Sequence, residues 1–320
     1  MIILTGYILK RLGQSCIVII LVSLFAFSLV YLMPGDPVYA LVGEGVELTE
    51  EEYQAEYIRL GLDRPVYERY ADWVVNVLHG DLGTSTKYNE PVSALLFRRL
   101  PVTMFLGGIS LVISTVIGIF FGMVASTKRG TVWDMIVTVF SNFGAAVPLF
   151  WLAVVGIYIF SVNLRWLPSF GFSFPWEGDP AASLKQLVLP VLAMSVGTIS
   201  STTRQTRSSM LEVIGLDYIR AARAKGVKEG NVIRRHALPN ALIPVVTLIG
   251  MNFRHLVAGS VASEKVFNIP GMGQLLTTAV FGRDVAVTQA CILIIAIVVS
   301  VANLVVDISY GIIDPRIRVQ

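Results

Sequence analysis

Residues Asp217–Pro239 read DYIRAARAKGVKEGNVIRRHALP and form a polar, basic stretch between two apolar runs of the chain. We refer to these residues as the polar segment. Asp217 is a residue type favoured at helix N-caps, and the alanine-rich residues after it favour a helix that continues to Lys225. Gly226 suits the left-handed position that follows the last turn of a helix. The polar segment therefore predicts a short helix that ends at a glycine.

The predicted helix has one small, flat face. Tyr218, Ala221 and Ala222 fall at spacings of three and four residues, which places them on the same side of a helix. Such a face lets another surface approach closely. A second short helix is expected at about residues 228–236, and it leads into the next apolar run.

Outside the polar segment, the apolar runs indicate a membrane protein. The chain is 54% hydrophobic and 15% charged, whereas soluble domains carry roughly a quarter charged residues. Six runs are long enough to cross a membrane, because about 20 helical residues span a hydrocarbon core of ~30 Å. They lie near 12–33, 102–125, 133–160, 187–206, 239–262 and 286–310. We therefore expect an all-α integral membrane fold with six transmembrane helices.

Two of these runs carry specific expectations. The run at 12–33 follows Lys10-Arg11, as the apolar part of a signal peptide would, but it is longer than such a part and no small-residue cleavage site follows it. We expect it to be a retained transmembrane helix. The run at 133–160 is long and contains Pro148, which predicts a tilted or kinked helix.

The distribution of charge orients the spans. More than half of the 25 Lys and Arg residues lie in one set of short loops and tails, whereas acidic residues gather in the longer loops on the opposite side. Basic loops favour the cytoplasm, so both termini and the polar segment are expected there. The chain then divides into an N-terminal tail with the first helix at 1–33, an extracytoplasmic region at 34–101, a five-helix core at 102–310 with a cytoplasmic loop at 207–238, and a cytoplasmic tail at 311–320.

Two of the outer segments have features of their own. The region 34–101 contains two stretches, 50–59 and 67–79, that are predicted to be amphipathic helices. The segment 161–185 is rich in aromatic rings, which either form a belt at the membrane interface or contact a substrate.

Several kinds of chemistry lack their sequence signatures. No glycine is followed by lysine, so the phosphate loop GxxxxGK[ST] is absent, and so are HExxH and GxSxG. We therefore assign no catalytic residue. The two cysteines, Cys16 and Cys291, lie in apolar runs and the three histidines are scattered, so we expect neither a disulfide nor a metal site. No carboxylate lies near the middle of a span, which argues against an ion-coupled carrier or channel.

The polar segment resembles a known signature. The segment resembles the EAA motif of ABC importer permeases in both its residues and their spacing. Gly226 follows Ala221-Ala222 after three residues, and His236-Ala237-Leu238-Pro239 follows after nine more. In that family the motif forms a coupling helix that docks on a separate ATPase. The resemblance implies ATPase coupling for Asp217, Tyr218, Arg220, Ala221, Ala222, Ala224, Lys225 and Gly226.

One residue departs from this signature. The family's glutamate falls at Arg220, where, after an N-cap at Asp217, arginine forfeits a capping-box bond and brings positive charge to the positive end of the helix dipole. We hypothesise that Arg220 instead faces an acidic group on the ATPase or a lipid phosphate.

Further motifs are similar to those of the oligopeptide, dipeptide and nickel branch of the family, so that the resemblance covers essentially the whole chain. They include Pro34-Gly35-Asp36-Pro37, Gly80-Asp81-Leu82-Gly83-Thr84-Ser85, Arg204-Gln205-Thr206-Arg207 and Asp314-Pro315-Arg316. The resemblance implies a type I ABC importer permease fold in a prokaryotic cell (inner) membrane. Its implied partners are a second homologous permease, an extracytoplasmic solute-binding protein and two cytoplasmic ABC ATPases, which bind ATP and Mg; no cofactor of this chain and no nucleic acid are expected. The implied cargo is a di- or oligopeptide, or alternatively nickel, a metal chelate (metallophore) or glutathione.

Four residues of the fifth run are candidates for a translocation pathway, namely Met251, Asn252, Arg254 and His255. Arg254 lies roughly 22 Å along the helix from Pro239, in the outer half of the membrane. A charge in lipid is costly, so Arg254 should face protein or water. It either attracts a carboxylate such as a peptide C-terminus, or snorkels, or pairs with an acidic group of a partner.

Overall fold

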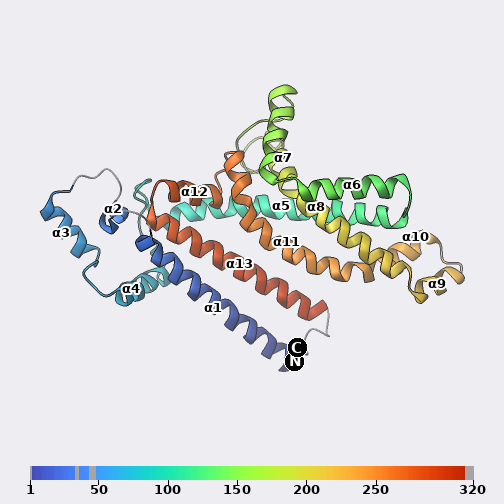
Figure 1. The fold of residues 1–320 in the computed structure, drawn as a ribbon, viewed down its shortest axis with the longest axis horizontal. Coiled ribbons are helices and arrows are strands. Elements are labelled where there is room, and N and C mark those ends of the chain that lie inside the picture. The colour runs from blue at the N-terminus through green and yellow to red at the C-terminus, as the bar shows by residue number, and fades with distance from the viewer. Residues whose placement is uncertain (1, 33–35, 43–47, 314–320) are drawn as a thin grey trace. The chain divides into compact units, whose positions relative to one another are not determined.

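The computed structural model describes residues 2–32, 36–42 and 48–313, and these residues are almost entirely helical (Figure 1). The described part of the chain contains one isolated β-bridge, between Thr84 and Pro91. The chain divides into two compact units. The first consists mainly of residues 104–269, and the second of residues 6–103 and 270–304.

Four described helices are long and apolar enough to cross a membrane, or five spans exist if a bent pair counts as one. The four are α1 (Ile2–Leu32), α5 (Val92–Thr127), α8 (Pro180–Ile214) and α13 (Val285–Ile313). The helix α11 (Leu238–Val266) covers the fifth predicted run. The helices extend beyond most of the predicted runs because a helix continues past its apolar part into polar residues.

The third predicted run is broken at Pro148. Helix α6 (Val132–Ala146) and helix α7 (Leu149–Gly156), which continues as the π-helix η1 (Ile157–Asn163), meet at an angle of 104°. Val147 has an extended backbone, as the residue before a proline prefers, and Pro148 precedes the first turn of α7. The expected effect of Pro148 is confirmed, but the result is two helices rather than one tilted span. We call Val147-Pro148 the break; in Figure 1, α7 turns away from the line of α6 there.

Helix α8 is the centre of the first unit, where it packs on α11, α6 and α7. Helix α8 also lies very close to α5, as two glycines of α5 show. A Cβ atom added at Gly118 would lie 2.6 Å from Cβ of Thr202, and one added at Gly122 would lie 2.5 Å from Cβ of Thr206. Gly118 and Gly122 are four residues apart, the spacing at which small residues let two membrane helices approach closely. Neither glycine leaves room for a side chain.

The second unit contains the short helices α2 (Pro37–Val42), α3 (Glu50–Arg59), α4 (Val66–Leu78) and α12 (Met272–Phe281). The predicted helix at 50–59 is confirmed, and a capping box between Thr49 and Glu52 fixes its start. The predicted helix at 67–79 is confirmed with a shift of one residue. The core of this unit includes Leu95 of α5, Met272 of α12 and Cys291 of α13. The apolar runs around Cys16 and Cys291 predict that both cysteines are buried. Cys291 is a buried free thiol, but Cys16 is exposed on α1.

The aromatic segment between η1 and α8 folds back on the first unit. Phe172, Phe174 and Trp176 surround Phe105 of α5, with ring centroids 5.2–6.3 Å from it. Phe174 and Trp176 also stack on each other at 4.7 Å. Three of the aromatic side chains that sequence analysis assigned to a belt or a substrate contact therefore form a packed cluster.

Candidate functional site

In the polar segment, helix α9 spans Asp217–Ala224, and Leu216 is its N-cap residue. The prediction that Asp217 is the N-cap is therefore wrong. Leu216 has an extended backbone, whereas Asp217 is already helical. The Asp217 side chain is almost fully exposed and pairs with Arg220 instead of capping backbone N–H groups. Helix α9 starts without a side-chain cap.

Arg220 interacts with two groups of its own neighbourhood. Its Nη2 donates to the carbonyl oxygen of Gly215 at 2.9 Å, and its Nη1 lies 3.2 Å from Oδ1 of Asp217. Because Leu216 is the N-cap, Arg220 stands one position beyond the capping-box position, so no capping bond is lost there. Its charge near the helix start is offset by Asp217. The side chain is 71% exposed and remains open to a partner.

Helix α9 ends as predicted at Gly226. The backbone of Gly226 has a φ of +77°, in the left-handed region. Its N–H donates to the carbonyl of Arg223 at 2.9 Å, and the N–H of Val227 donates to the carbonyl of Ala222 at 3.3 Å. These two bonds form a Schellman motif, which satisfies carbonyls that a helix end would otherwise leave unpaired.

A buried isoleucine holds α9 in place. Ile219 is fully buried in an apolar cluster that ties α9 to the end of α8 and to the start of α11. The other buried members are Met210, Val232, Ile233, Ala237 and Ala241. Sequence analysis missed Ile219. The available signal was that it is the one large aliphatic residue in an otherwise polar or small helix.

The exposed face of α9 differs from the predicted one. Ala222 packs against the apolar cluster, whereas Ala221 is exposed. The Tyr218 hydroxyl donates to the carbonyl of His236 at 3.2 Å and accepts from Nδ2 of Asn240 at 3.0 Å. Of the predicted face, Tyr218 and Ala221 are exposed, whereas Ala222 is half-buried. The exposed residues of the helix and its end are Asp217, Tyr218, Arg220, Ala221, Arg223, Ala224, Lys225 and Gly226.

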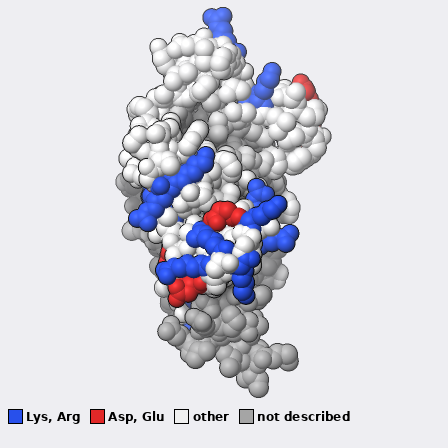
Figure 2. Space-filling model, turned by 90° about the vertical axis from the view of Figure 1, so that its right-hand side faces the viewer, with Lys and Arg blue, Asp and Glu red and all other residues white. Residues whose placement is uncertain are grey.

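The second predicted helix is not a separate element. A single turn, α10 (Glu229–Asn231), passes into the π-helix η2 (Val232–Ala237), which continues into α11. Arg223 of α9 makes two bonds to Glu229, from Nε at 3.0 Å and from Nη2 at 2.7 Å. These bonds lower the pKa of the Glu229 carboxyl below its usual value. The end of the molecule that carries α9 and α10 presents many Lys and Arg side chains (Figure 2).

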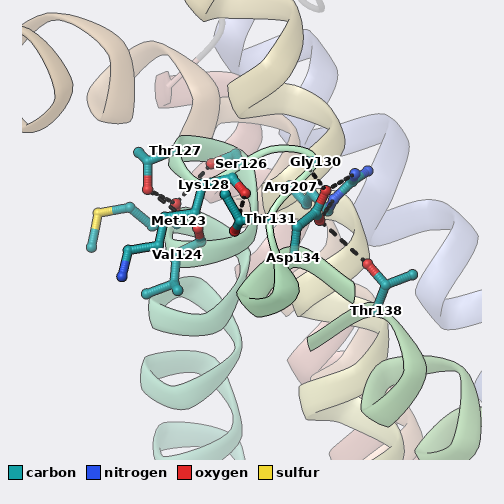
Figure 3. Close-up of polar contacts among 10 residues, drawn as sticks. All are labelled: Met123, Val124, Ser126, Thr127, Lys128, Gly130, Thr131, Asp134, Thr138 and Arg207. Atoms are coloured by element: carbon teal, nitrogen blue, oxygen red, sulfur yellow. Dashed lines mark hydrogen bonds and ion pairs between the residues drawn. The ribbon is translucent and has the colours of Figure 1, made fainter. Parts of the chain in front are cut away.

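An ion pair joins α6 to α8 (Figure 3). Arg207 of α8 donates from Nε to Oδ1 of Asp134 at 2.7 Å and from Nη2 to Oδ2 at 3.0 Å. The backbone N–H of Gly130 donates to Oδ2 of Asp134 at 3.1 Å, and Asp134 is buried. A two-pronged bond of this kind fixes both position and orientation. One turn before Arg207, Arg204 donates to the carbonyl of Ser141 on α6 at 3.2 Å.

A cavity of about 300 Å³ lies beside the break in the first unit. Its walls come from the end of α6, the start of α7, the middle of α8 and Asn252 of α11. Asn252 is 9% exposed, and its amide nitrogen has no hydrogen-bond partner among the described residues. The predicted pathway residue Met251 is 45% exposed and does not line this cavity. The side chains of Arg254 and His255, also predicted for the pathway, lie outside the described part of the structure.

No group of three or more His, Cys, Asp or Glu side chains in the described residues could hold a metal ion. The arrangement instead offers a charged surface segment at one end of α8 and a cavity lined by uncharged residues at its middle.

Comparison with known proteins defines the family. Residues 114–319 match the family described as the binding-protein-dependent transport system inner membrane component, and residues 4–107 match the N-terminal region of such components. The chain therefore belongs to this family. It is an inner-membrane component that crosses the membrane several times.

Relatives match over nearly the full length. A Brucella suis protein named as a peptide transport system permease is 40% identical over 98% of this chain and 99% of its own. The oligopeptide transport system permease protein AppB of Bacillus subtilis is 36% identical over 98% of this chain and 100% of its own. A chain of the inward-facing MetNI methionine ABC transporter shares the fold, with a TM-score of 0.57 and 21% identity over 69% of this chain and 96% of that chain.

Proposed function

We propose that this chain is the membrane-spanning permease subunit of an ATP-driven importer of di- and oligopeptides. The observation that carries the proposal is its similarity, over almost the whole length, to permeases named for peptide and oligopeptide transport. The alternative cargoes nickel, metal chelates and glutathione have no comparable support. The chain itself hydrolyses no ATP in this proposal, since separate ATPase subunits do so.

The proposed topology has six spans and both termini in the cytoplasm. The broken pair α6 and α7 provides the third span and α11 the fifth. The polar segment then faces the cytoplasm, which is consistent with the Lys and Arg side chains gathered at that end. One such chain provides half of a pathway. A second homologous permease, two ATPase subunits and an extracytoplasmic solute-binding protein complete the importer.

In this proposal α9 is the coupling helix. Its apolar side is held by Ile219, while Arg220 and Ala221 remain exposed for a docking ATPase. When ATP closes the ATPase dimer, α9 moves with it, and α8 and α11 move with α9 because the three share one apolar cluster. The permease thereby alternates between outward-facing and inward-facing states.

We further place Met251, Asn252, Arg254 and His255 of α11 on the pathway. Arg254 would attract the C-terminal carboxylate of a peptide. Uptake of peptides by a complex that carries Arg254→Leu tests this role. A clear loss of uptake with intact assembly is expected, and full transport would exclude the role.

The proposed function is tested with the complete importer in proteoliposomes. Uptake of labelled di- and oligopeptides should require ATP and the binding protein and should stop with vanadate. Excess unlabelled peptide should compete, whereas nickel and glutathione should not. Uptake of nickel or glutathione in place of peptides would overturn the assignment of cargo, and vanadate-insensitive uptake would favour an ion-coupled carrier.

The role of Arg220 has its own test in the same system. Arg220→Glu should reduce the ATPase stimulation by loaded binding protein, because it places an acid where we propose a contact with an acidic group or a phosphate. Arg59→Glu in α3 makes the same charge change away from the polar segment and serves as the control. Unchanged stimulation in Arg220→Glu would refute the contact.

A further inference from the structure

The break places irregular backbone within a run of apolar residues. Helix α6 ends at Ala146 and leaves its last carbonyl groups without partners inside the helix, as every helix end does. In hydrocarbon such groups are costly, and irregular backbone occurs there only where it is buried in protein or lines a water-filled cavity. The break lines a cavity of about 300 Å³, which Ala145, Val147 and Leu149 help to bound.

Asn252 provides the second, independent sign of a ligand. Its side chain lines the cavity, is nine-tenths buried, and has an amide nitrogen without a partner in the described part of the chain. Native proteins satisfy nearly all buried polar groups, because an unmade hydrogen bond costs free energy. A carboxamide can turn about its Cβ–Cγ bond, so it can present either its donors or its acceptor to a molecule in the cavity.

The position of the cavity is that of a transport site. Its wall on α8 runs from Ala193 to Ser201, in the middle of Pro180–Ile214, and Asn252 is in the middle of Leu238–Val266. Transporters commonly bind substrates at mid-membrane, beside helices that are interrupted there. The cavity is at the lower end of the roughly 300–1,000 Å³ typical of small-molecule sites, so it accommodates part of a peptide and not a whole oligopeptide.

The walls select a neutral, hydrogen-bonding ligand. The described lining residues carry no charge and combine apolar groups such as Leu152 and Met194 with the hydroxyls of Thr198 and Ser201. An ion would lose its hydration without an opposite charge in return. A peptide bond loses less, because Asn252 and the hydroxyls can replace the water molecules bound to its N–H and C=O groups.

We propose that this cavity is a subsite for the main chain of the transported peptide, and that Asn252 hydrogen-bonds one of its amide groups during passage. This inference rests on the proposed function. Because the bond is made to the main chain, the subsite accepts peptides of different sequence. The small residues of the walls leave space for side chains of different size.

Gly197 allows a steric test of the same subsite. A Cβ atom added at Gly197 meets no atom within 4 Å, so a side chain there would enter open space at the cavity. Gly144, on the opposite wall, is different, because an added Cβ atom would lie 2.5 Å from Oγ of Ser200. Gly197→Leu therefore adds a side chain at the cavity, and its Cβ atom requires no displacement of the helices.

The experiment compares three variants in the reconstituted importer. Asn252→Leu keeps the side-chain shape and removes its hydrogen bonds, Gly197→Leu occupies the cavity, and Thr247→Val is the control, a polar-to-apolar change on α11 outside the cavity. Peptide uptake and ATPase stimulation by loaded binding protein are measured together. Asn252→Leu and Gly197→Leu should each lower uptake of neutral tripeptides five- to tenfold, while stimulation stays within twofold of the wild type.

The results distinguish a failure of the proposed subsite from a failure of the proposed function. If the wild type takes up no peptide, the proposed function fails. If the wild type transports and both cavity variants transport at the rate of Thr247→Val, the subsite is refuted. If Asn252→Leu does not assemble, Gly197→Leu decides alone: a loss of uptake that grows with peptide side-chain volume supports the subsite, and normal uptake overturns it.

Discussion

The polar segment and the break are both interruptions of helix, but they are built in opposite ways. At the polar segment the chain turns twice within a few residues, and the turns are closed by hydrogen bonds at Gly226 and Tyr218 and by the buried Ile219. At the break, one extended residue and a proline separate two helices, a cavity lies beside them, and the amide nitrogen of Asn252 has no hydrogen-bond partner among the described residues. The helix end at Gly226 is satisfied by backbone hydrogen bonds of the polar segment itself, whereas the cavity beside the break contains a buried amide that a ligand could bind.

This difference is consistent with the role that we propose for each region. A segment that transmits the movement of a partner must keep its shape, so its bonds are made within the chain. A site through which cargo passes must offer bonds that are free until the cargo arrives. The two regions are connected by α8, which forms one wall of the cavity at Thr198 and Ser201 and ends directly before the polar segment.

The largest effect is expected from a change that separates α8 from α5. In Gly122→Val, the new Cβ atom would lie 2.5 Å from Cβ of Thr206 and 2.7 Å from the backbone oxygen of Thr203. Backbone cannot give way locally, so we expect a loss of about 3 kcal/mol or more and little assembled protein. The control is Gly108→Val on the same helix, where an added Cβ atom meets nothing within 4 Å. Equal yields of assembled importer for the two variants would show that α8 is not fixed in this way.

The next effect concerns the anchor of the polar segment. Ile219→Ala removes a fully buried side chain from the apolar cluster, which should destabilise the segment by about 2–3 kcal/mol. Because Gly226 and the other hydrogen bonds remain, α9 should persist but lose its fixed position. We expect ATPase stimulation to fall severalfold while the binding protein still docks. Leu216→Ala, next to α9 but 46% exposed, is the control, and the comparison fails if both variants behave alike.

A smaller effect is expected from the Asp134–Arg207 pair, which joins the helix before the break to the helix that carries the polar segment. Asp134→Ala should cost about 2 kcal/mol, less than the roughly 3–5 kcal/mol of a fully buried pair, since the Arg207 side chain is 31% exposed. Melting temperatures of Asp134→Asn, Arg207→Gln and the double variant give the coupling between the two residues. Additive losses in that cycle would mean that the pair contributes no mutual stabilisation.

The sequence could predict those features of the two regions that depend on a single residue and its own backbone, and not those that depend on packing with other helices. Gly226 and Pro148 act on their own backbone, so the end of α9 and the place of the break could be predicted. The start of α9 could not, because only Gly215-Leu216 separates α8 from α9, and Leu216 must serve as the N-cap whatever its side chain. The burial of Ile219 depends on how the end of α8 and the start of α11 pack around it, which the sequence of α9 does not determine.

The candidate site shows the same division. The sequence could only suggest Asn252 as a pathway candidate, because it is a polar residue in an apolar run. The cavity beside it is lined by three other helices, and the sequence alone could not show that its amide nitrogen has no partner among the described residues. Pro148 predicts a bend at this place, but its presence alone does not predict the angle of 104°. The six apolar runs could be recognised in the sequence. The close contact of α5 and α8 could not be predicted from it, because it depends on how the two helices are placed in space.

The smallest effect is expected at the exposed rim of the polar segment, where Glu229 accepts two bonds from Arg223. These bonds lower the pKa of Glu229 from its usual 4.5, so the folded state binds a proton less readily than the unfolded chain. The stabilisation of the folded state by this ion pair is therefore complete above about pH 4.5 and disappears as the pH falls through the lowered pKa. Both side chains are more than a third exposed, so the effect is only a few tenths of a kcal/mol. The melting temperature of wild type should exceed that of Glu229→Gln slightly at pH 7, the gap should shrink in 1 M salt, and it should close as the pH falls through the lowered pKa of Glu229. A gap that stays constant from pH 7 down to the acid side of that pKa would mean that the rim is held by contacts other than this ion pair.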